Sequence, residues 1–250
     1  MLHQVVRTLP WSHVITIMTA VTSPDDREWY AEQDARNGWS RAVLRHQITT
    51  GLRRRIGAAP NNFDRTLDPA DSDQARELLR DPYVFDHLGL TGPVRERDLE
   101  HALTDQLQAT LTELGRGLAL VGRQVRLTVT DPDGTADQFA IDLLFFHVDQ
   151  LRYVVVELKT TRYEPAHMGQ LQTYVAIVDD QLRRPLHNPT LGLLICAGRT
   201  QATVRYSLAT TNVPIAVADY AGLPADAQAA LPPASELQAL LTGHLNPGDV

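Results

Sequence analysis

The stretch Ile141-Asp-Leu-Leu-Phe-Phe-His-Val-Asp-Gln-Leu-Arg-Tyr-Val-Val-Val-Glu-Leu-Lys159 decides the fold. Two apolar runs of strand character lie on either side of Asp149-Gln150, which predicts an antiparallel hairpin. Each run is interrupted by one acid, Asp142 in the first and Glu157 in the second. A charge inside such a run costs free energy to bury unless it is paired or binds a metal. The hairpin therefore predicts a site as well as a fold.

The loop of this hairpin predicts its register. A two- or four-residue loop centred on Asp149-Gln150 pairs Asp142 directly with Glu157, with Cβ atoms about 4.5 to 5.5 Å apart. Two acids at that distance destabilise the ladder unless a cation lies between them, and two carboxylates with open positions for water suit Mg²⁺. Strand alternation puts Lys159 on the same face as Glu157.

Lys159 is the only lysine among 23 basic residues. Its compact ammonium can donate to a small reacting oxygen, which a planar guanidinium does poorly. A divalent ion with a lysine beside it can catalyse the hydrolysis of a phosphodiester. The alternative is that the two acids and the lysine are ordinary edge-strand charges, but the apolar residues around them favour a buried hairpin.

Helices and further strands are predicted around the hairpin. The order helix, three strands, helix, strand indicates an α/β or α+β sheet domain. The expected helices are 72–79, 95–114, 168–184 and one after Ser235, and the expected strands are 124–130, 139–148, 151–160, 191–197, 204–208 and 215–217.

The helix predicted over 95–114 carries leucines at spacings of three and four. Turning about 100° per residue, these leucines cover one arc of the helix, and Glu100 falls inside it. We therefore expect the Glu100 carboxylate to face inward. The alternative is a glutamate at the rim of the apolar stripe that reaches solvent.

The N-terminal part is predicted to be helical. Residues 25–56 read as two helices broken at Asn37-Gly38, with Ser40 as N-cap of the second. The basic run Arg53-Arg-Arg55 is interpreted as a solvated helix end. Residues 57–73 lack periodicity and read as a linker, so we place a domain boundary near residue 70.

Composition excludes several classes of protein. The formal charge of −7 argues against a wholly basic nucleic-acid coat. The single cysteine, Cys196, lies in an apolar setting that predicts a reduced core position. Neither a spanning helix nor an export signal is recognisable, so we expect a cytoplasmic protein. A nucleic-acid partner would have to be bound in a local groove, to which the fold could bring Arg116, Arg123, Arg126 and Arg162.

The hairpin and the helix before it resemble the PD-(D/E)XK nuclease superfamily, whose fold is restriction-endonuclease-like. The resemblance lies in Ile141-Asp142, fourteen intervening residues, then Glu157-Leu158-Lys159, preceded by a helix with an inward Glu100. The amino-acid sequence is similar to that of the YhcG-type branch over nearly the whole chain. Members of that branch usually have a longer helical N-terminal region, so a shortened homologue or a fragment is expected. The motifs are Arg27-Glu-Trp-Tyr-Ala-Glu-Gln, Asn37-Gly-Trp-Ser-Arg, Asp81-Pro-Tyr-Val-Phe-Asp, Arg97-Asp-Leu-Glu, Val121-Gly-Arg-Gln, Ile141-Asp-Leu-Leu-Phe-Phe-His and Val156-Glu-Leu-Lys.

The resemblance implies a role for each site residue. Asp142 and Glu157 would bind Mg²⁺, with Mn²⁺ as a substitute, together with the backbone carbonyl of Leu158. Lys159 would stabilise the attacking hydroxide or the developing charge on the phosphate. Glu100 would reach the metal directly or through water.

The resemblance also assigns the helix that follows the lysine strand. Members of the superfamily often carry Gln-x-x-x-Tyr there, and Gln170-Leu-Gln-Thr-Tyr174 matches. The two polar ends lie one turn apart on one helix face and would orient the metal site or a substrate phosphate. The alternative is a core tyrosine with its hydroxyl at the surface.

The prediction as a whole is a restriction-endonuclease-like α/β nuclease domain over 71–243, with a mixed central sheet flanked by helices. A helical segment over 1–70 that helps bind DNA or a partner precedes it, and a tail over 244–250 follows. The expected activity is metal-dependent phosphodiester hydrolysis, of DNA in the first instance. Alternatives are a catalytically inactive DNA-binding or assembly subunit of a defence or mobile-element system, and a hydrolase of another phosphate ester. A homo-oligomer is left open.

Overall fold

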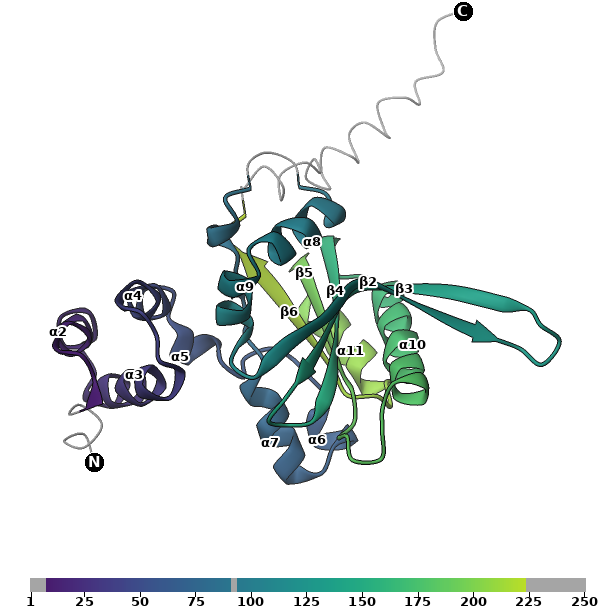
Figure 1. The fold of residues 1–250 in the computed structure, drawn as a ribbon, viewed down its shortest axis with the longest axis horizontal. Helices are drawn as coiled ribbons and strands as arrows, with labels where there is room; N and C mark the ends of the chain where they lie inside the picture. Colours follow the sequence, from purple (N-terminus) through teal and green to yellow (C-terminus); the bar gives the residue numbers. More distant parts are fainter. Residues whose placement is uncertain (1–7, 91–93, 224–250) are drawn as a thin grey trace, which may run out of the picture.

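A mixed sheet forms the centre of the protein (Figure 1). The computed structural model describes residues 8–90 and 94–223, and within them six strands have the order β1-β6-β5-β4-β3-β2. Strands β2, β3 and β4 form the predicted antiparallel meander, while β4, β5, β6 and β1 run parallel. The strands are β1 (Tyr83–Val84), β2 (Leu118–Thr130), β3 (Ala136–His147), β4 (Arg152–Arg162), β5 (Leu191–Gly198) and β6 (Ile215–Ala221).

The central hairpin has the register that its loop predicts. Residues Leu143 to His147 of β3 pair with Val156 to Arg152 of β4, which is the alignment that places the two acids opposite each other. Before Leu143, β3 pairs with β2, and this two-stranded ribbon projects away from the sheet in Figure 1. The register prediction is confirmed.

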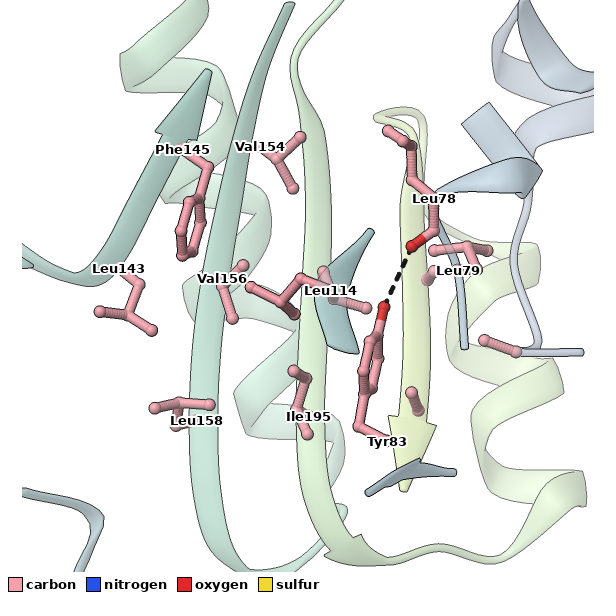
Figure 2. Packing of buried hydrophobic residues seen from close by; sticks show 14 of the residues in the cluster. Leu78, Leu79, Tyr83, Leu114, Leu143, Phe145, Val154, Val156, Leu158 and Ile195 are labelled. Atoms are coloured by element: carbon pink, nitrogen blue, oxygen red, sulfur yellow. Dashed lines mark hydrogen bonds between the residues drawn. The ribbon is translucent and has the colours of Figure 1, made fainter. Parts of the chain in front are cut away.

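Helices cover both faces of the sheet. One core lies between the sheet and α6 to α9, and Figure 2 shows part of it, in which Val156, Ile195 and Leu114 come together from β4, β5 and α9. A second core packs α10 and α11 on the other face. The helices of the sheet domain are α6 (Phe63–Thr66), α7 (Pro69–Glu77), η2 (Asp86–Leu88), α8 (Glu96–Asp105), α9 (Leu107–Leu114), α10 (Pro165–Gln181) and α11 (Gln201–Ala209), and those before it are α2 (Trp11–Ala20), α3 (Pro24–Asn37), α4 (Arg41–Thr49) and α5 (Leu52–Arg55).

The segment predicted as a strand at 204–208 is helical. Parallel strands such as β5 and β6 need a crossover connection, and α11 supplies it. Val204 and Leu208 lie one helical turn apart, and both are buried in the second core. The prediction was wrong because a short apolar run fits a strand and a helix equally well until its partners are known.

The single helix predicted over 95–114 is two helices, α8 and α9, that meet at Gln106. The Gln106 side chain donates a hydrogen bond to the carbonyl oxygen of Leu88 at 3.1 Å, and the Thr110 hydroxyl donates to that of Leu103 at 2.8 Å. These contacts change the direction of the chain, which leucine spacing alone does not reveal. The helix predicted after Ser235 and the tail over 244–250 lie outside the described residues.

The N-terminal helices form a group with its own small core, in which Ile17 and Leu44 are buried. The predicted break is confirmed, since Gly38 ends α3 in a left-handed conformation with φ of 61°. Ser40 is the predicted N-cap of α4, and its hydroxyl oxygen accepts a hydrogen bond from the Val43 N–H at 3.3 Å. Among the described residues, no helix combines the length and the apolar character that crossing a bilayer requires.

Residues 57–73, predicted as a linker, pack against the sheet. Phe63 is fully buried in the first core. The Asn62 side chain donates a hydrogen bond to the Val213 carbonyl at 2.9 Å and accepts one from the Ile215 N–H at 2.8 Å. The linker interpretation was wrong because these polar residues satisfy backbone groups beside β6. The domain boundary placed nearby stays a prediction.

Arg55 is buried, whereas the sequence predicted a solvated helix end. Its side chain forms an ion pair with Glu113 of α9, and only 4% of the residue is exposed. It also donates hydrogen bonds to the carbonyl oxygens of Thr50 at 3.1 Å and Pro82 at 3.0 Å. Arg55 thereby ties the helical group to the sheet domain, a long-range contact that no local pattern signals.

Candidate active site

The two acids of the hairpin lie where β3 and β4 separate. The paired ladder ends at Leu143, and the next side chain, Asp142, accepts a hydrogen bond on Oδ2 from the N–H of Leu158 at 2.9 Å. Glu157 is 1% exposed, and the negative charge of Asp142 acts on it. The structure therefore brings together the acids that the sequence paired.

Lys159 lies beside these acids. Its Nζ is 2.9 Å from Glu157 Oε1 and 3.4 Å from Glu96 Oε2 at the start of α8. Burial by itself would lower the pKa of Lys159, but the charges of Glu157, Glu96 and Asp142 raise it on balance. The ammonium therefore keeps its charge within the acidic cluster.

Ionising Glu157 and Asp142 in their buried positions costs free energy. Burial raises the pKa of Glu157 to about 7, and the neighbouring Asp142 charge adds to this, while Lys159 opposes it. Burial also raises the pKa of Asp142, against the hydrogen bond from Leu158 and the charge of Lys159. Glu157 therefore holds a proton near neutral pH more readily than a free carboxyl group, and a further cation close by would oppose both shifts.

Glu100 faces inward as predicted, with 3% of the residue exposed. Its Oε2 accepts a hydrogen bond from Gln124 Nε2 at 2.6 Å, and the same amide nitrogen lies 3.1 Å from Asp142 Oδ1. Arg123 Nη1 lies 3.5 Å from Glu100 Oε1. The alternative of a glutamate that reaches solvent is wrong, and Glu100 joins the hairpin acids through Gln124.

Gln170 and Tyr174 form a pair on α10. Gln170 Nε2 lies 2.8 Å from the Tyr174 hydroxyl, as expected for residues one turn apart. Burial raises the pKa of Tyr174, and the charges of Glu157 and Asp142 contribute to this. Tyr174 is therefore close enough to the acidic cluster for the negative charges of the cluster to affect its pKa.

Two residues of the cluster escaped the sequence analysis. Glu96 precedes Glu100 by one helical turn, so an i, i+4 spacing on α8 could have indicated it. Gln124 faces Asp142 in the β2–β3 register and has a positive φ of 48°, which is rare for a residue with a side chain. It is the last residue of the motif Val121-Gly-Arg-Gln, but its role depends on the pairing of β2 with β3, which the motif does not reveal.

The residues fit a divalent cation. Glu157 Oε2 is buried and has no hydrogen-bond partner among the described residues, and Glu100 Oε1 is buried with only the ion pair to Arg123 at 3.5 Å. Buried carboxylate oxygens without a donor are suited to a hard cation. No group of three or more His, Cys, Asp or Glu side chains in the described parts of the chain is close enough to hold an ion alone. Water and a backbone carbonyl would complete the coordination of a divalent cation.

The arginines that the sequence analysis considered for a nucleic-acid groove lie at different places in the structure. Arg123 faces Glu100, and Arg116 donates to the carbonyl oxygen of Arg36 at 2.6 Å. Arg162 lies 3.4 Å from the Thr200 hydroxyl at the end of β4. Of these, Arg123 lies directly at the acidic cluster.

The stability of the metal-free protein is expected to fall as pH rises from about 4.5 to about 7. Over that range the folded protein keeps a proton on Glu157 that the unfolded chain has lost, so the proton difference favours folding at the acidic end. Glu157→Gln should remove much of this fall and raise the free energy of unfolding at pH 8 by on the order of 3 kcal/mol.

Urea unfolding in EDTA at several pH values measures this. Glu32→Gln, at an exposed position of α3, is the matched control and should keep the wild-type slope. Equal slopes for both variants would contradict the prediction.

A mixed sheet that presents an aspartate, a Glu-x-Lys triplet and a helix-borne glutamate at one point has the restriction-endonuclease-like architecture of a PD-(D/E)XK domain. A family model described as "YhcG PDDEXK nuclease domain" matches residues 76–233, and a "DUF1016 N-terminal domain" model matches residues 1–55. The chain belongs to the YhcG PDDEXK nuclease family.

One curated relative is "Putative nuclease YhcG" of Escherichia coli (strain K12). It is 30% identical over 215 residues, which cover 85% of this chain and 56% of the relative. The chain thus spans about half the length of the relative it matches.

Solved structures show more distant similarity. "Structure of EndoMS-dsDNA2 complex" has 18% identity and a TM-score of 0.34, covering 52% of this chain and 45% of that one. "Crystal structure of a repair endonuclease from Pyrococcus abyssi" has 14% identity and a TM-score of 0.33, covering 52% and 47%. At these scores neither similarity extends to activity or substrate.

Proposed function

We propose that this chain is a divalent-metal-dependent nuclease that hydrolyses phosphodiester bonds in DNA. The observation that carries the proposal is the buried cluster of Asp142, Glu157 and Lys159, in which a carboxylate oxygen of Glu157 has no hydrogen-bond partner in the described chain. Such a cluster is costly for folding alone, so a chemical role explains it better than a structural one. The PD-(D/E)XK resemblance supports DNA as the polymer.

Asp142, Glu157 and the backbone carbonyl of Leu158 would hold Mg²⁺ or Mn²⁺, with Glu100 bound directly or through water. The bound ion would supply Lewis-acid activation of water and of the phosphate. Asp142 is oriented for this by the Leu158 N–H. Gln124 bridges Glu100 and Asp142, so it would keep the two carboxylates aligned.

Lys159 would stabilise the negative charge that develops on the attacking and phosphoryl oxygens. Its pKa is raised on balance by the surrounding acids despite burial, so it would act as a fixed cation and not as a proton acceptor. Gln170 and Tyr174 would orient the metal site or a substrate phosphate through their shared hydrogen bond.

We also propose that the segment over 1–70, whose helical group is α2 to α5, helps bind DNA or a partner. The exposed arginines Arg41 and Arg45 on α4 and Arg54 on α5 support this, since electrostatic contacts to phosphates supply much of DNA affinity. A cytoplasmic location and homo-oligomer formation stay predictions.

Cleavage assays with the full chain test the proposed activity. Supercoiled plasmid, linear duplex, single-stranded DNA and RNA of matched sequence are incubated with Mg²⁺, Mn²⁺ or EDTA. We expect DNA cleavage with either metal and none in EDTA, because the acids alone cannot activate water. Protein carrying Asp142→Asn, purified in parallel, gives the baseline for contaminating nucleases.

Each other result would change the assignment. Cleavage that persists in EDTA contradicts metal dependence, and cleavage of RNA alone contradicts DNA as substrate. DNA binding without cleavage under any condition would identify the inactive subunit instead.

A further inference from the structure

A cavity of about 780 Å³ lies between the helical group and the sheet domain. The helical group contributes α3 and the loop after it, and the sheet domain contributes the ends of α7, α9 and the β3–β4 turn. Sites for small ligands commonly have volumes of about 300–1,000 Å³ and lie between domains. The catalytic cluster contributes none of the lining residues, so this is a separate feature.

Two buried polar groups in the cavity wall lack partners. Arg80 and Gln150 are each 8% exposed, and Arg80 Nε and Gln150 Oε1 have no hydrogen-bond partner in the described chain. The other end of the guanidinium is held, since Arg80 Nη1 donates to the carbonyl oxygens of Glu77 at 2.7 Å and Leu79 at 2.8 Å. Because both atoms are themselves buried, they show a cavity wall whose polar groups the described chain does not fully satisfy, while the accessible lining groups would contact a ligand.

A glycine keeps space open above this arginine. A Cβ atom at Gly115 would lie 3.2 Å from Arg80 Nη2, and Gly115 has a φ of +119°. Gly117 leaves similar room, because a Cβ there would lie 2.7 Å from the His147 ring. The cavity is thus shaped by backbone positions that tolerate no side chain.

The walls combine aromatic and cationic groups. Trp29 and Trp39 line the cavity from the helical group, together with Arg36. Arg116 lines it from the other side, and its Nη1 donates to the Arg36 carbonyl at 2.6 Å. The indole rings offer flat apolar faces, and the guanidinium groups match phosphate oxygens.

The charge of the lining favours an anion. In the described chain no acidic side chain lies within ion-pair distance of the three lining arginines, which are Arg36, Arg80 and Arg116. Two acids, Glu77 and Asp149, also line the cavity, so the arginines leave a small positive excess.

We propose that this cavity binds a phosphorylated nucleotide, with its base on the tryptophan rings and its phosphate on the guanidinium groups. The ligand is a free nucleotide or the phosphorylated end of a nucleic-acid strand. In the second form the inference rests on the proposed nuclease function. Base stacking on aromatic side chains beside a cationic groove is a general way to bind single nucleotides of a strand.

The site is distant from the catalytic cluster. His147 at the cavity and Asp142 at the cluster are five positions apart on β3, roughly 17 Å at about 3.4 Å per residue. One nucleotide cannot contact both places. The cavity would therefore hold a nucleotide other than the one at the bond that is cut.

Tryptophan fluorescence tests the proposal directly. The chain has three tryptophans, two in the cavity and Trp11 on the surface with 74% of it exposed. The full chain in EDTA, where cleavage is blocked, is titrated with dAMP and with an oligonucleotide carrying a 5′-phosphate, a 3′-phosphate or none. We expect saturable quenching that requires the phosphate. Trp39→Ala should weaken binding at least tenfold, and Trp11→Ala less than twofold.

A charge pair provides a second, independent comparison. Arg36→Glu changes a cavity residue, and Arg205→Glu makes the same change at an exposed position of α11 outside the cavity. Both positions are on the surface, so both variants should fold. We expect at least tenfold weaker nucleotide binding for Arg36→Glu alone. Equal weakening in the two variants, or no quenching by any phosphorylated ligand, would overturn the proposal.

The ligand forms and the two proposals are separable. Binding of dAMP alone identifies a free nucleotide, and binding of a phosphorylated oligonucleotide alone identifies a strand end. Lys159→Ala should bind nucleotide like the wild type even if it no longer cuts DNA. Cleavage without nucleotide binding in the cavity overturns this inference alone, and binding without cleavage overturns the proposed nuclease alone.

Discussion

Replacing Asp142 by asparagine is expected to lower the single-turnover rate of plasmid cleavage by roughly 10²- to 10³-fold. Asparagine has the same shape and can still accept the hydrogen bond that Leu158 donates. It lacks the negative charge that would hold the cation. Because burial and neighbouring acids oppose that charge in the metal-free protein, the variant should unfold at the same or a higher urea concentration. Loss of activity with unchanged stability separates chemistry from folding.

Matched variants define this result. Asp137→Asn makes the same change at an exposed position of β3 and should cleave like the wild type. Lys159→Ala should lose activity to a similar degree through loss of its ammonium. Equal activity of all these proteins would remove the catalytic role of the cluster.

Replacing Arg55 by methionine is expected to lower the free energy of unfolding by about 3–5 kcal/mol. Methionine fills similar space, but the Glu113 carboxylate would stay buried with its charge uncompensated. That carboxylate also accepts a hydrogen bond from the Val84 N–H at 2.8 Å, so it cannot readily turn towards solvent. The same change removes the Arg55 bonds to Thr50 and Pro82. The helical group should therefore unfold at a lower urea concentration than the sheet domain, giving two transitions.

Urea unfolding followed by circular dichroism and tryptophan fluorescence measures this effect. Arg53→Met is the control, because Arg53 pairs with Asp26 at the surface and such pairs contribute about 0–1 kcal/mol. Adding Glu113→Gln to Arg55→Met should recover part of the loss by removing the unpaired charge. Similar losses for Arg53→Met and Arg55→Met would contradict the special role of the buried pair.

The register of the hairpin and the positions of its two acids could be predicted from the sequence. Its register depends on loop length and strand alternation, and both are local properties that can be counted along the chain. The acids interrupt apolar runs, so their positions stand out without knowledge of the fold. Glu100 was predicted to be buried for the same reason, because helical spacing places it among leucines.

Three of the incorrect predictions concern contacts between distant segments. The run at 204–208 became a helix because parallel β5 and β6 require a crossover. The polar residues near Asn62 looked like a linker, yet their partners lie about 150 positions away along the chain. Arg55 looked solvated because its partner, Glu113, lies 58 positions away.

The sequence by itself determined the antiparallel hairpin, its register, the inward glutamate and the choice of Asp142, Glu157 and Lys159, since each follows from spacing within a short segment. Only the tertiary structure decided that Gln124 bridges two acids, that Glu96 reaches the lysine, and that two modules enclose a cavity. Those features arise where segments far apart in the chain pack together, and the free energy of that packing is shared among many residues. No local pattern carries that information.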